Sequence, residues 1–300
     1  MIQTIDRLDD PRIASYARVG DPAWLHDRGL FVAEGRLVVR RLFELQRYAV
    51  ESVLVAPAAL QSLRDALPEA ATVYVAEQHV LNSITGINFH RGCLALAHRP
   101  DVDDVVSPFS GGVDRVVSPF RGVSPGHHLI ALEGIGNPDN VGGIFRNAAA
   151  FGVDAVLLDP ASGDPLYRKA IRTSMGAALS LPFVRLEPWP DALKELADQG
   201  FRVLALTPRA GATTLDEIAQ RPPDRWVLLA GAEGPGLSDA ALATAEVHIR
   251  IPTTAAIDSL NVTVAVGIAL SRLFQLAYPA ASNSGAIRGE SGTANAERRS

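Results

Sequence analysis

Three short loops of this sequence combine glycines with polar side chains, and each follows an apolar run that is typical of a buried strand. The loops read GIGNPDNVGGIFRN from residue 134, GAEGPGLS from residue 231 and IPTTAAIDSLN from residue 251. In open α/β sheets ligands bind beyond the carboxyl ends of the strands, where such loops lie. The three loops are therefore the candidate ligand site of the chain.

The first loop leads into a stretch with helical periodicity. We expect Asn140 to cap this helix, while Gly142 and Gly143 allow another backbone to come close. Arg146 should lie on the first turns of the helix, where a guanidinium can hold a phosphate in a bidentate grip. Taken alone, this spacing more often marks a capped helix with an exposed arginine.

The second and third loops each allow two interpretations. Three glycines with Glu233 and Pro235 suit a backbone that wraps around a planar ligand, but the same loop reads as a strand-to-helix turn capped by Ser238. Both can hold at once. In the third loop we expect Ser259 to cap the last helix and Asn261 to lie in its first turn, and SLN alone is simply a helix start.

Two common nucleotide-binding loops are missing. GIGNPD lacks the third glycine of the dinucleotide fingerprint, so a dehydrogenase is disfavoured. The pattern GxxxxGK[ST] does not occur, and neither of the lysines, Lys169 and Lys194, follows a glycine-rich loop. A nucleoside triphosphatase is disfavoured as well.

The elements that must position these loops follow an α/β pattern. Residues 29–99 alternate helical and strand-like runs and predict a small α/β domain after an N-terminal extension, residues 1–28. Residues 100–127 are rich in Pro, Gly and Ser, repeat VVSPF, and predict a flexible linker. Residues 128–279 predict a mainly parallel sheet with helices on both faces, and the polar residues 280–300 predict a disordered tail.

Composition narrows the class of protein. The 300 residues are 47% hydrophobic, which is enough for two packed cores. A net charge of -5 argues against a protein that coats nucleic acid by bulk charge, so any RNA contact must be a local patch. One cysteine, Cys93, and no His or Cys cluster predict neither a disulfide nor a metal site. The sequence has no signal peptide or membrane span, and we expect a cytoplasmic protein.

Together and in this order, the three loops resemble those of the SpoU, or TrmH-like, branch of the SPOUT RNA methyltransferases. The resemblance extends from Leu129 to Leu276. The N-terminal part, through FVAEGRLVV near Glu34 and FHRGCLAL around Arg91, resembles the ribosomal-protein-like RNA substrate-binding domain of many members.

The resemblance implies a deep trefoil knot in the C-terminal domain, although knots are otherwise nearly absent from proteins. It implies a homodimer with its sites at the subunit interface, in which the last helix, from Ser259 to Tyr278, helps to bury the dimer surface. The continuous apolar face of this helix would equally suit a core within the chain. It also implies methyl transfer from S-adenosylmethionine to a ribose 2′-hydroxyl, without metal. By analogy the substrate is ribosomal RNA first and transfer RNA second. Base methylation and a non-catalytic RNA-binding or assembly factor on the same fold are the alternatives.

Matching the family pattern residue by residue gives the expected site. Arg146 matches the arginine implicated in catalysis. The polar residues around it match Asn140, Glu233, Ser259 and Asn261. The cofactor positions match Gly231, Ile251 and Leu260, to which we add Thr207. Since a guanidinium stays protonated, we expect Arg146 to grip a phosphate and stabilise the developing oxyanion rather than act as a base.

Two groups of basic residues are candidate RNA contacts. Arg168, Lys169 and Arg172 follow Tyr167 on one short predicted helix, and a solvated helix face explains them about equally well. Arg36 and Arg40 share a face of an N-terminal helix.

Overall fold

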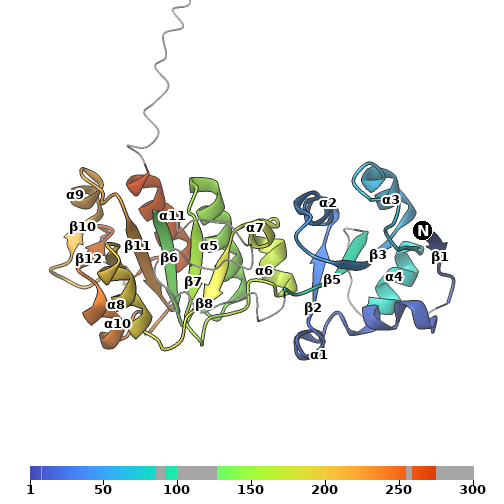
Figure 1. Ribbon diagram of the computed structural model, residues 1–300, viewed down its shortest axis with the longest axis horizontal. Coiled ribbons are helices and arrows are strands. Elements are labelled where there is room, and N and C mark those ends of the chain that lie inside the picture. The colour runs from blue at the N-terminus through green and yellow to red at the C-terminus, as the bar shows by residue number, and fades with distance from the viewer. Residues whose placement is uncertain (8, 86–91, 101–126, 255–258, 275–300) are drawn as a thin grey trace, which may run out of the picture.

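The computed structural model describes the chain except residues 8, 86–91, 101–126, 255–258 and 275–300. The described residues form two α/β domains that lie side by side (Figure 1). Most of the expected linker, its repeated VVSPF segment and the expected C-terminal tail lie outside the described residues.

The N-terminal domain is a mixed sheet between two helical layers. Among the described residues its strand order is β1-β4-β3-β5-β2, with β5 antiparallel to both of its neighbours. The strands are β1 (Ile2–Thr4), β2 (Leu30–Glu34), β3 (Val50–Val55), β4 (Val73–Val75) and β5 (Cys93–His98). The helices are η1 (Pro11–Arg18), α1 (Pro22–Asp27), α2 (Arg36–Leu45), α3 (Pro57–Leu63) and α4 (Gln78–Thr85). The predicted helices and strands of residues 29–99 are all present.

Residues 1–28 differ from the expected extension because they complete this domain. Strand β1 adds to the edge of the sheet by pairing with β4. Ile13 and Tyr16 of η1 are buried against the sheet, and the Tyr16 hydroxyl lies 2.9 Å from the Ser52 hydroxyl of β3. The apolar residues of this segment are few and are separated by Pro and Asp residues, so they form no helical or strand-like period that could have predicted its structure.

The C-terminal domain is a parallel sheet, which confirms the predicted fold class. Its order within the described residues is β10-β12-β9-β11-β6-β7-β8. The strands are β6 (His128–Glu133), β7 (Ala155–Leu158), β8 (Phe183–Arg185), β9 (Arg202–Leu206), β10 (Thr213–Thr214), β11 (Trp226–Gly231) and β12 (Val247–Arg250). The helices are α5 (Pro138–Phe151), α6 (Arg168–Thr173), α7 (Ala177–Ser180), α8 (Asp191–Asp198), α9 (Leu215–Ala219), α10 (Asp239–Thr244) and α11 (Val262–Leu273). The trefoil knot implied by the family resemblance stays a prediction.

Both faces of this sheet are covered, as the apolar strands predict. Helices α5, α9 and α11 pack on one face, and α8 and α10 pack on the other. Two glycines of α5 allow this helix to pack closely against its neighbouring helices. A Cβ on Gly142 would stand 2.6 Å from the Ala170 carbonyl oxygen of α6, and one on Gly143 would stand 2.5 Å from the Thr263 methyl of α11. The expected close approach of another backbone is confirmed at Gly142, whereas at Gly143 the close neighbour is a side chain.

Helices α6 and α7 lie between the two sheets and join the domains (Figure 1). We predicted one helix here, but Met175 and Gly176 have φ of 53° and 81° and break it in two. Ile171 and Leu179 enter the apolar core beneath α2. The N-terminal domain is therefore docked on the loop and helices that follow β7.

Candidate functional site

A cavity of about 220 Å³ opens at the carboxyl edge of the parallel sheet. Its walls are the loops that follow β9, β11 and β12. All four residues expected to contact the cofactor line it, namely Thr207, Gly231, Ile251 and Leu260. Glu233 and Ser259 line it as well. The structure thus brings the second and third sequence loops together around one cavity.

Gly231 is required by the protein's own backbone at this cavity. The loop after β11 folds back on itself, with the Gly236 amide donating to the Ala232 carbonyl at 3.0 Å. A Cβ on Gly231 would stand 2.5 Å from both the Gly236 carbonyl carbon and the Leu237 amide nitrogen. The missing side chain keeps the loop tight, and the loop backbone then forms one wall of the cavity.

A chain of hydrogen bonds connects the three sequence loops. The Asn261 Nδ2 donates to Asn140 Oδ1 at 3.0 Å and to Glu233 Oε1 at 2.6 Å. The Thr263 hydroxyl lies 3.3 Å from the Asn140 carbonyl oxygen. Since Asn140 is almost fully buried, this chain fixes the beginning of α5 against the beginning of α11.

The helix caps differ from those predicted at two of three positions. Helix α5 is capped by Asn137, whose Oδ1 accepts from the Asp139 amide at 2.9 Å, because Pro138 takes the first helical position. Asn140 lies inside the first turn and is free to hold Asn261. Helix α11 is capped by Asn261 rather than Ser259, through bonds from the Thr263 and Val264 amides. The predicted Ser238 cap of α10 is confirmed at 3.1 Å.

Arg146 is the one predicted catalytic residue that the structure leaves outside this group. It lies in the third turn of α5 and is exposed, whereas we expected it in the first turns. It has no hydrogen bond or ion pair with the described residues, and it is absent from the cavity lining. Its guanidinium is therefore available to a ligand but does not line the cavity.

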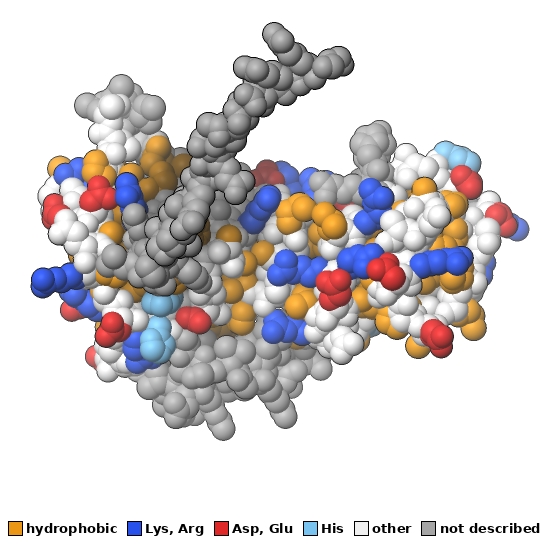
Figure 2. Space-filling model, turned by 90° about the horizontal axis from the view of Figure 1, so that it is seen from above, with side chains coloured by type: hydrophobic (Ala, Val, Ile, Leu, Met, Phe, Trp, Pro, Cys, Tyr) orange, Lys and Arg blue, Asp and Glu red, His pale blue; other side chains and the backbone are white. Residues whose placement is uncertain are grey.

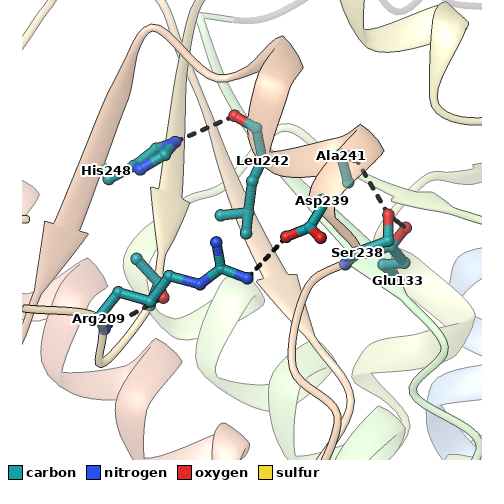
Figure 3. A network of polar contacts seen from close by, with 8 residues as sticks. Glu133, Arg209, Ser238, Asp239, Ala241, Leu242 and His248 are labelled. Carbon is teal, nitrogen blue, oxygen red and sulfur yellow. Dashed lines mark hydrogen bonds and ion pairs between the residues drawn. The ribbon is translucent and has the colours of Figure 1, made fainter.

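Glu133, at the end of β6, is a site residue that the sequence analysis missed. Its Oε2 accepts from the Ser238 amide at 2.8 Å, and its Oε1 accepts from the Ser238 hydroxyl and the Trp189 indole, each at 2.8 Å. Figure 3 shows Glu133 beside Ser238 at the beginning of α10. Only its position at a strand end, next to the first loop, could have signalled this role.

Arg209 closes the same network on the other side of α10. Its guanidinium bonds Asp239 at 2.8 Å, and its amide donates to the Thr207 hydroxyl at 3.3 Å (Figure 3). The imidazole Nε2 of His248 lies 3.0 Å from the Leu242 carbonyl oxygen. The loop after β9 and the loop after β11 are thereby both attached to α10.

Glu133→Gln is expected to loosen the glycine-rich loop and weaken ligand binding in the cavity. A glutamine amide offers one acceptor oxygen and one NH₂ donor, so at least one of the three donors on Glu133 loses its acceptor. We expect a loss of about 1–3 kcal/mol in the free energy of binding, the cost of one unsatisfied group. The measurement is calorimetric titration with S-adenosylmethionine. Unchanged affinity for S-adenosylmethionine would contradict a role of Glu133 in holding the loop.

The predicted RNA-contacting residues are largely held in ion pairs. Arg168 bonds the buried Glu34 of β2 at 2.9 Å, and Arg172 lies 3.6 Å from the same carboxylate. Lys169 bonds Asp139 at 2.7 Å, and this hydrogen bond lowers the pKa of Asp139. The first two pairs join the domains, a role that the sequence analysis did not foresee.

The arginines of α2 and of the segment that follows it differ among themselves. Arg40 makes a bidentate pair with Asp65 of the segment after α3, at 2.6 and 2.7 Å. Arg41 and Arg47 donate to Ser180 of the other domain. Arg36 is exposed, with no hydrogen bond or ion pair to the described residues. Figure 2 shows Lys and Arg side chains gathered across the N-terminal half of the upper face, which is the face that carries α2.

No group of three His, Cys, Asp or Glu side chains within the described residues is placed to hold a metal ion. No helix in the described part of the chain is long and apolar enough to span a membrane.

Comparison with known proteins agrees with this arrangement. The described fold and its cavity at the carboxyl edge of the sheet define a ligand-binding parallel α/β domain. A family model described as the SpoU rRNA Methylase family matches residues 127–271. An uncharacterized tRNA/rRNA methyltransferase of Mycobacterium bovis is 39% identical over 274 residues, which cover 89% of this chain and 90% of the relative. The chain therefore belongs to the SpoU methylase family of RNA methyltransferases.

Solved structures match both domains. An RNA 2′-O ribose methyltransferase is 26% identical, with a TM-score of 0.70 over 92% of this chain and 98% of that chain. An AdoMet-bound rRNA methyltransferase from Sinorhizobium meliloti is 21% identical, with a TM-score of 0.73 and the same coverage. The likeness to the Sinorhizobium meliloti protein is a likeness of fold alone. The two-domain arrangement is thus shared across the length of these chains.

Proposed function

We propose that the protein transfers a methyl group from S-adenosylmethionine to a ribose 2′-hydroxyl of RNA, with ribosomal RNA as the substrate. One observation carries the proposal: the second and third loops of the family pattern line one cavity, and the Asn140–Asn261–Glu233 hydrogen bonds join the first loop to them. The solved structure that is 26% identical is named an RNA 2′-O ribose methyltransferase, which supports the ribose as acceptor.

The cavity suits S-adenosylmethionine by its lining. Leu206, Ile251 and Leu260 offer apolar surface to an adenine ring, and the loop 231–238 offers backbone groups to its edge. Glu233 and Thr207 supply polar groups beside them. The cofactor would bring a methyl group bound to a sulfonium, which needs no metal to be electrophilic.

The residues of the chain would then position the acceptor. In-line attack requires the 2′-oxygen to be held in line with the methyl carbon and the sulfur, so alignment supplies much of the rate. Ser259, in the cavity wall, and Asn261, at the beginning of α11, are placed to orient the ribose hydroxyl. Arg146 would hold the neighbouring phosphate and stabilise the developing negative charge on oxygen.

A homodimer would resolve the separation of Arg146 from the cavity. Helices α5 and α11 pack together, and Val264 on α11 is 50% exposed. A surface hollow beside it is lined by Asn147, Gly267 and Ile268. This apolar face supports the proposal that a second copy packs on α5 and α11, so that Arg146 of one subunit reaches the cavity of the other.

Two measurements test the proposed function together. Calorimetry with S-adenosylmethionine should show saturable binding, and incubation of the protein with tritiated cofactor and bulk cellular RNA should label that RNA. Digestion to nucleosides should yield a 2′-O-methylnucleoside, and fractionation should place it in ribosomal RNA. Label in transfer RNA would change only the substrate. A methylated base, or no cofactor binding at all, would refute the proposal, and the latter would favour a non-catalytic assembly factor.

A further inference from the structure

A second hollow lies between the two domains, on the edge of the parallel sheet that also carries the cofactor cavity. Its volume is about 400 Å³, and small-molecule sites span about 300–1,000 Å³. One wall comes from α1 and β2, and the other comes from the loops that follow β6 and β7. The lining used in the argument is Ala23, His26, Phe31, Arg99, Tyr167 and Arg168.

The hollow adjoins the first of the three sequence loops, which begins at residue 134. Gly136 and Pro138 line it and flank Asn137, the cap of α5, and Asn140 lies two residues further along. Since β11, β6 and β7 are neighbouring parallel strands about 4.8 Å apart, the hollow lies two strand spacings from the glycine-rich loop, on the order of 10 Å. An RNA whose ribose is held near Asn140 would pass beside the hollow.

The chemistry of the hollow suits a flat, partly apolar ring. Its floor is apolar, because Leu30, Phe31 and Leu166 are buried there. At its sides are the exposed His26 ring and the half-buried Tyr167 ring, whose hydroxyl has no hydrogen bond to the described residues. Unpaired RNA bases bind by stacking on such rings and by hydrogen bonds at their edges.

Two guanidinium groups, those of Arg99 and Arg168, also line the hollow, and each is held by a hydrogen bond or ion pair to the protein. Arg99 Nε donates to the Leu30 carbonyl at 3.0 Å, and the same guanidinium pairs with Asp164. Arg168 is fixed by the buried Glu34. A guanidinium has five N–H donors, so each of these groups keeps donors for a base edge or a phosphate. Because both pairs cross the domain boundary, the hollow exists only when the domains are docked.

We infer that this interdomain hollow binds an unpaired base of the RNA substrate, next to the nucleotide that is methylated. The inference rests on the proposed function and adds a specificity subsite to it. A base can enter only after leaving its helix, so the enzyme selects loops, bulges or single strands rather than continuous duplex. The side chains at the mouth then select which base is accepted.

Ala23→Trp tests the inference by filling the hollow from its wall. Ala23 is exposed, follows Pro22 at the beginning of α1, and does not line the cofactor cavity. Ala58→Trp is the matched control, since Ala58 is exposed and follows Pro57 at the beginning of α3. A second variant, Tyr167→Leu, removes the ring while keeping an apolar side chain.

The probe is total cellular RNA, cross-linked to the full-length protein by ultraviolet light and mapped by mass spectrometry. We expect cross-links in the peptides that contain His26 or Tyr167. Ala23→Trp and Tyr167→Leu should lower them and raise the KM for RNA about tenfold or more, the scale of one lost base stack. Ala58→Trp should behave as wild type, and calorimetry with S-adenosylmethionine should be unchanged in all three.

Cross-links confined to other peptides, or equal behaviour of Ala23→Trp and Ala58→Trp, would overturn the subsite. Failure of the proposed function looks different: the wild-type protein would then bind no cofactor or would methylate no ribose, whatever the cross-links show. A variant that loses cofactor binding is discarded as misfolded, and the other variant of the hollow decides the outcome.

Discussion

Arg146→Ala is expected to abolish methyl transfer while leaving the fold and the cofactor cavity intact. Arg146 is exposed and makes no hydrogen bond or ion pair with the described residues, so its removal should change the stability by less than about 0.5 kcal/mol. If it stabilises charge that develops only in the transition state, kcat should fall about 10²–10³-fold. Cofactor binding should be unaffected, since Arg146 does not line the cavity.

Tritium transfer to bulk cellular RNA measures the rate, and calorimetry with S-adenosylmethionine measures the cofactor affinity. Arg221→Ala is the matched control, because Arg221 is another exposed arginine of the same domain and does not line the cavity. Arg146→Lys keeps the charge but loses the bidentate fork, so it should remain strongly impaired. Near-normal turnover in Arg146→Lys would contradict the bidentate grip, and near-normal turnover in Arg146→Ala would remove Arg146 from the mechanism.

The same variant tests whether Arg146 acts across a dimer interface. Asn261→Ala removes the side chain that connects Asn140 to Glu233 at the cavity and should be inactive by itself. In a mixed dimer of the two variants, one of the two sites would contain both an intact cavity and an intact Arg146. Recovery of activity on mixing would support action in trans, whereas two inactive proteins that stay inactive would place Arg146 within its own subunit.

Much of the fold was predictable because the sequence carries it in local patterns. Apolar runs of four to six residues between helical periods predicted the parallel strands, and the helices that cover both faces follow from them. Gly231, Ile251 and Leu260, assigned from the order of three loops, do line one cavity, and so does Thr207, which we added to them. The loops could be recognised because each stands at the end of a strand, where topology alone brings them to one edge.

The parts that were missed depend on contacts between distant residues. Asn137 rather than Asn140 caps α5 because Pro138 occupies the first helical turn, and Asn140 is then used by Asn261, 121 residues away. Glu133 holds Ser238 over a separation of 105 residues, which no periodicity reveals. The pairing of Arg168 with Glu34 across the domain boundary was also missed, and it forms because a buried carboxylate needs a partner. Local spacing cannot distinguish an arginine that faces solvent from one that joins two domains.

The contacts of Gly231 could not be predicted from local spacing either, and they give Gly231→Ala a large expected effect. The sequence suggested that Gly231 lines a ligand pocket, and it does line the cavity. The structure adds a second reason for the glycine, because its Cβ position is occupied by the backbone of residues 236 and 237. Gly231→Ala is therefore expected to push the loop 231–238 away from β11. Because that loop forms a wall of the cavity, S-adenosylmethionine binding should weaken by at least about tenfold, and the strain should cost about 1–3 kcal/mol of stability.

Calorimetric titration and thermal unfolding measure the two effects of Gly231→Ala separately. Gly20→Ala is the control, since an added Cβ there meets nothing within 4 Å and its φ is not positive. Glu133→Gln loosens the same loop from its other end, through Ser238, without adding atoms to it. If Gly231→Ala binds the cofactor normally although Glu133→Gln does not, the loop wall is set by its anchor on β6. The close contact at Gly231 would then be a feature of packing alone.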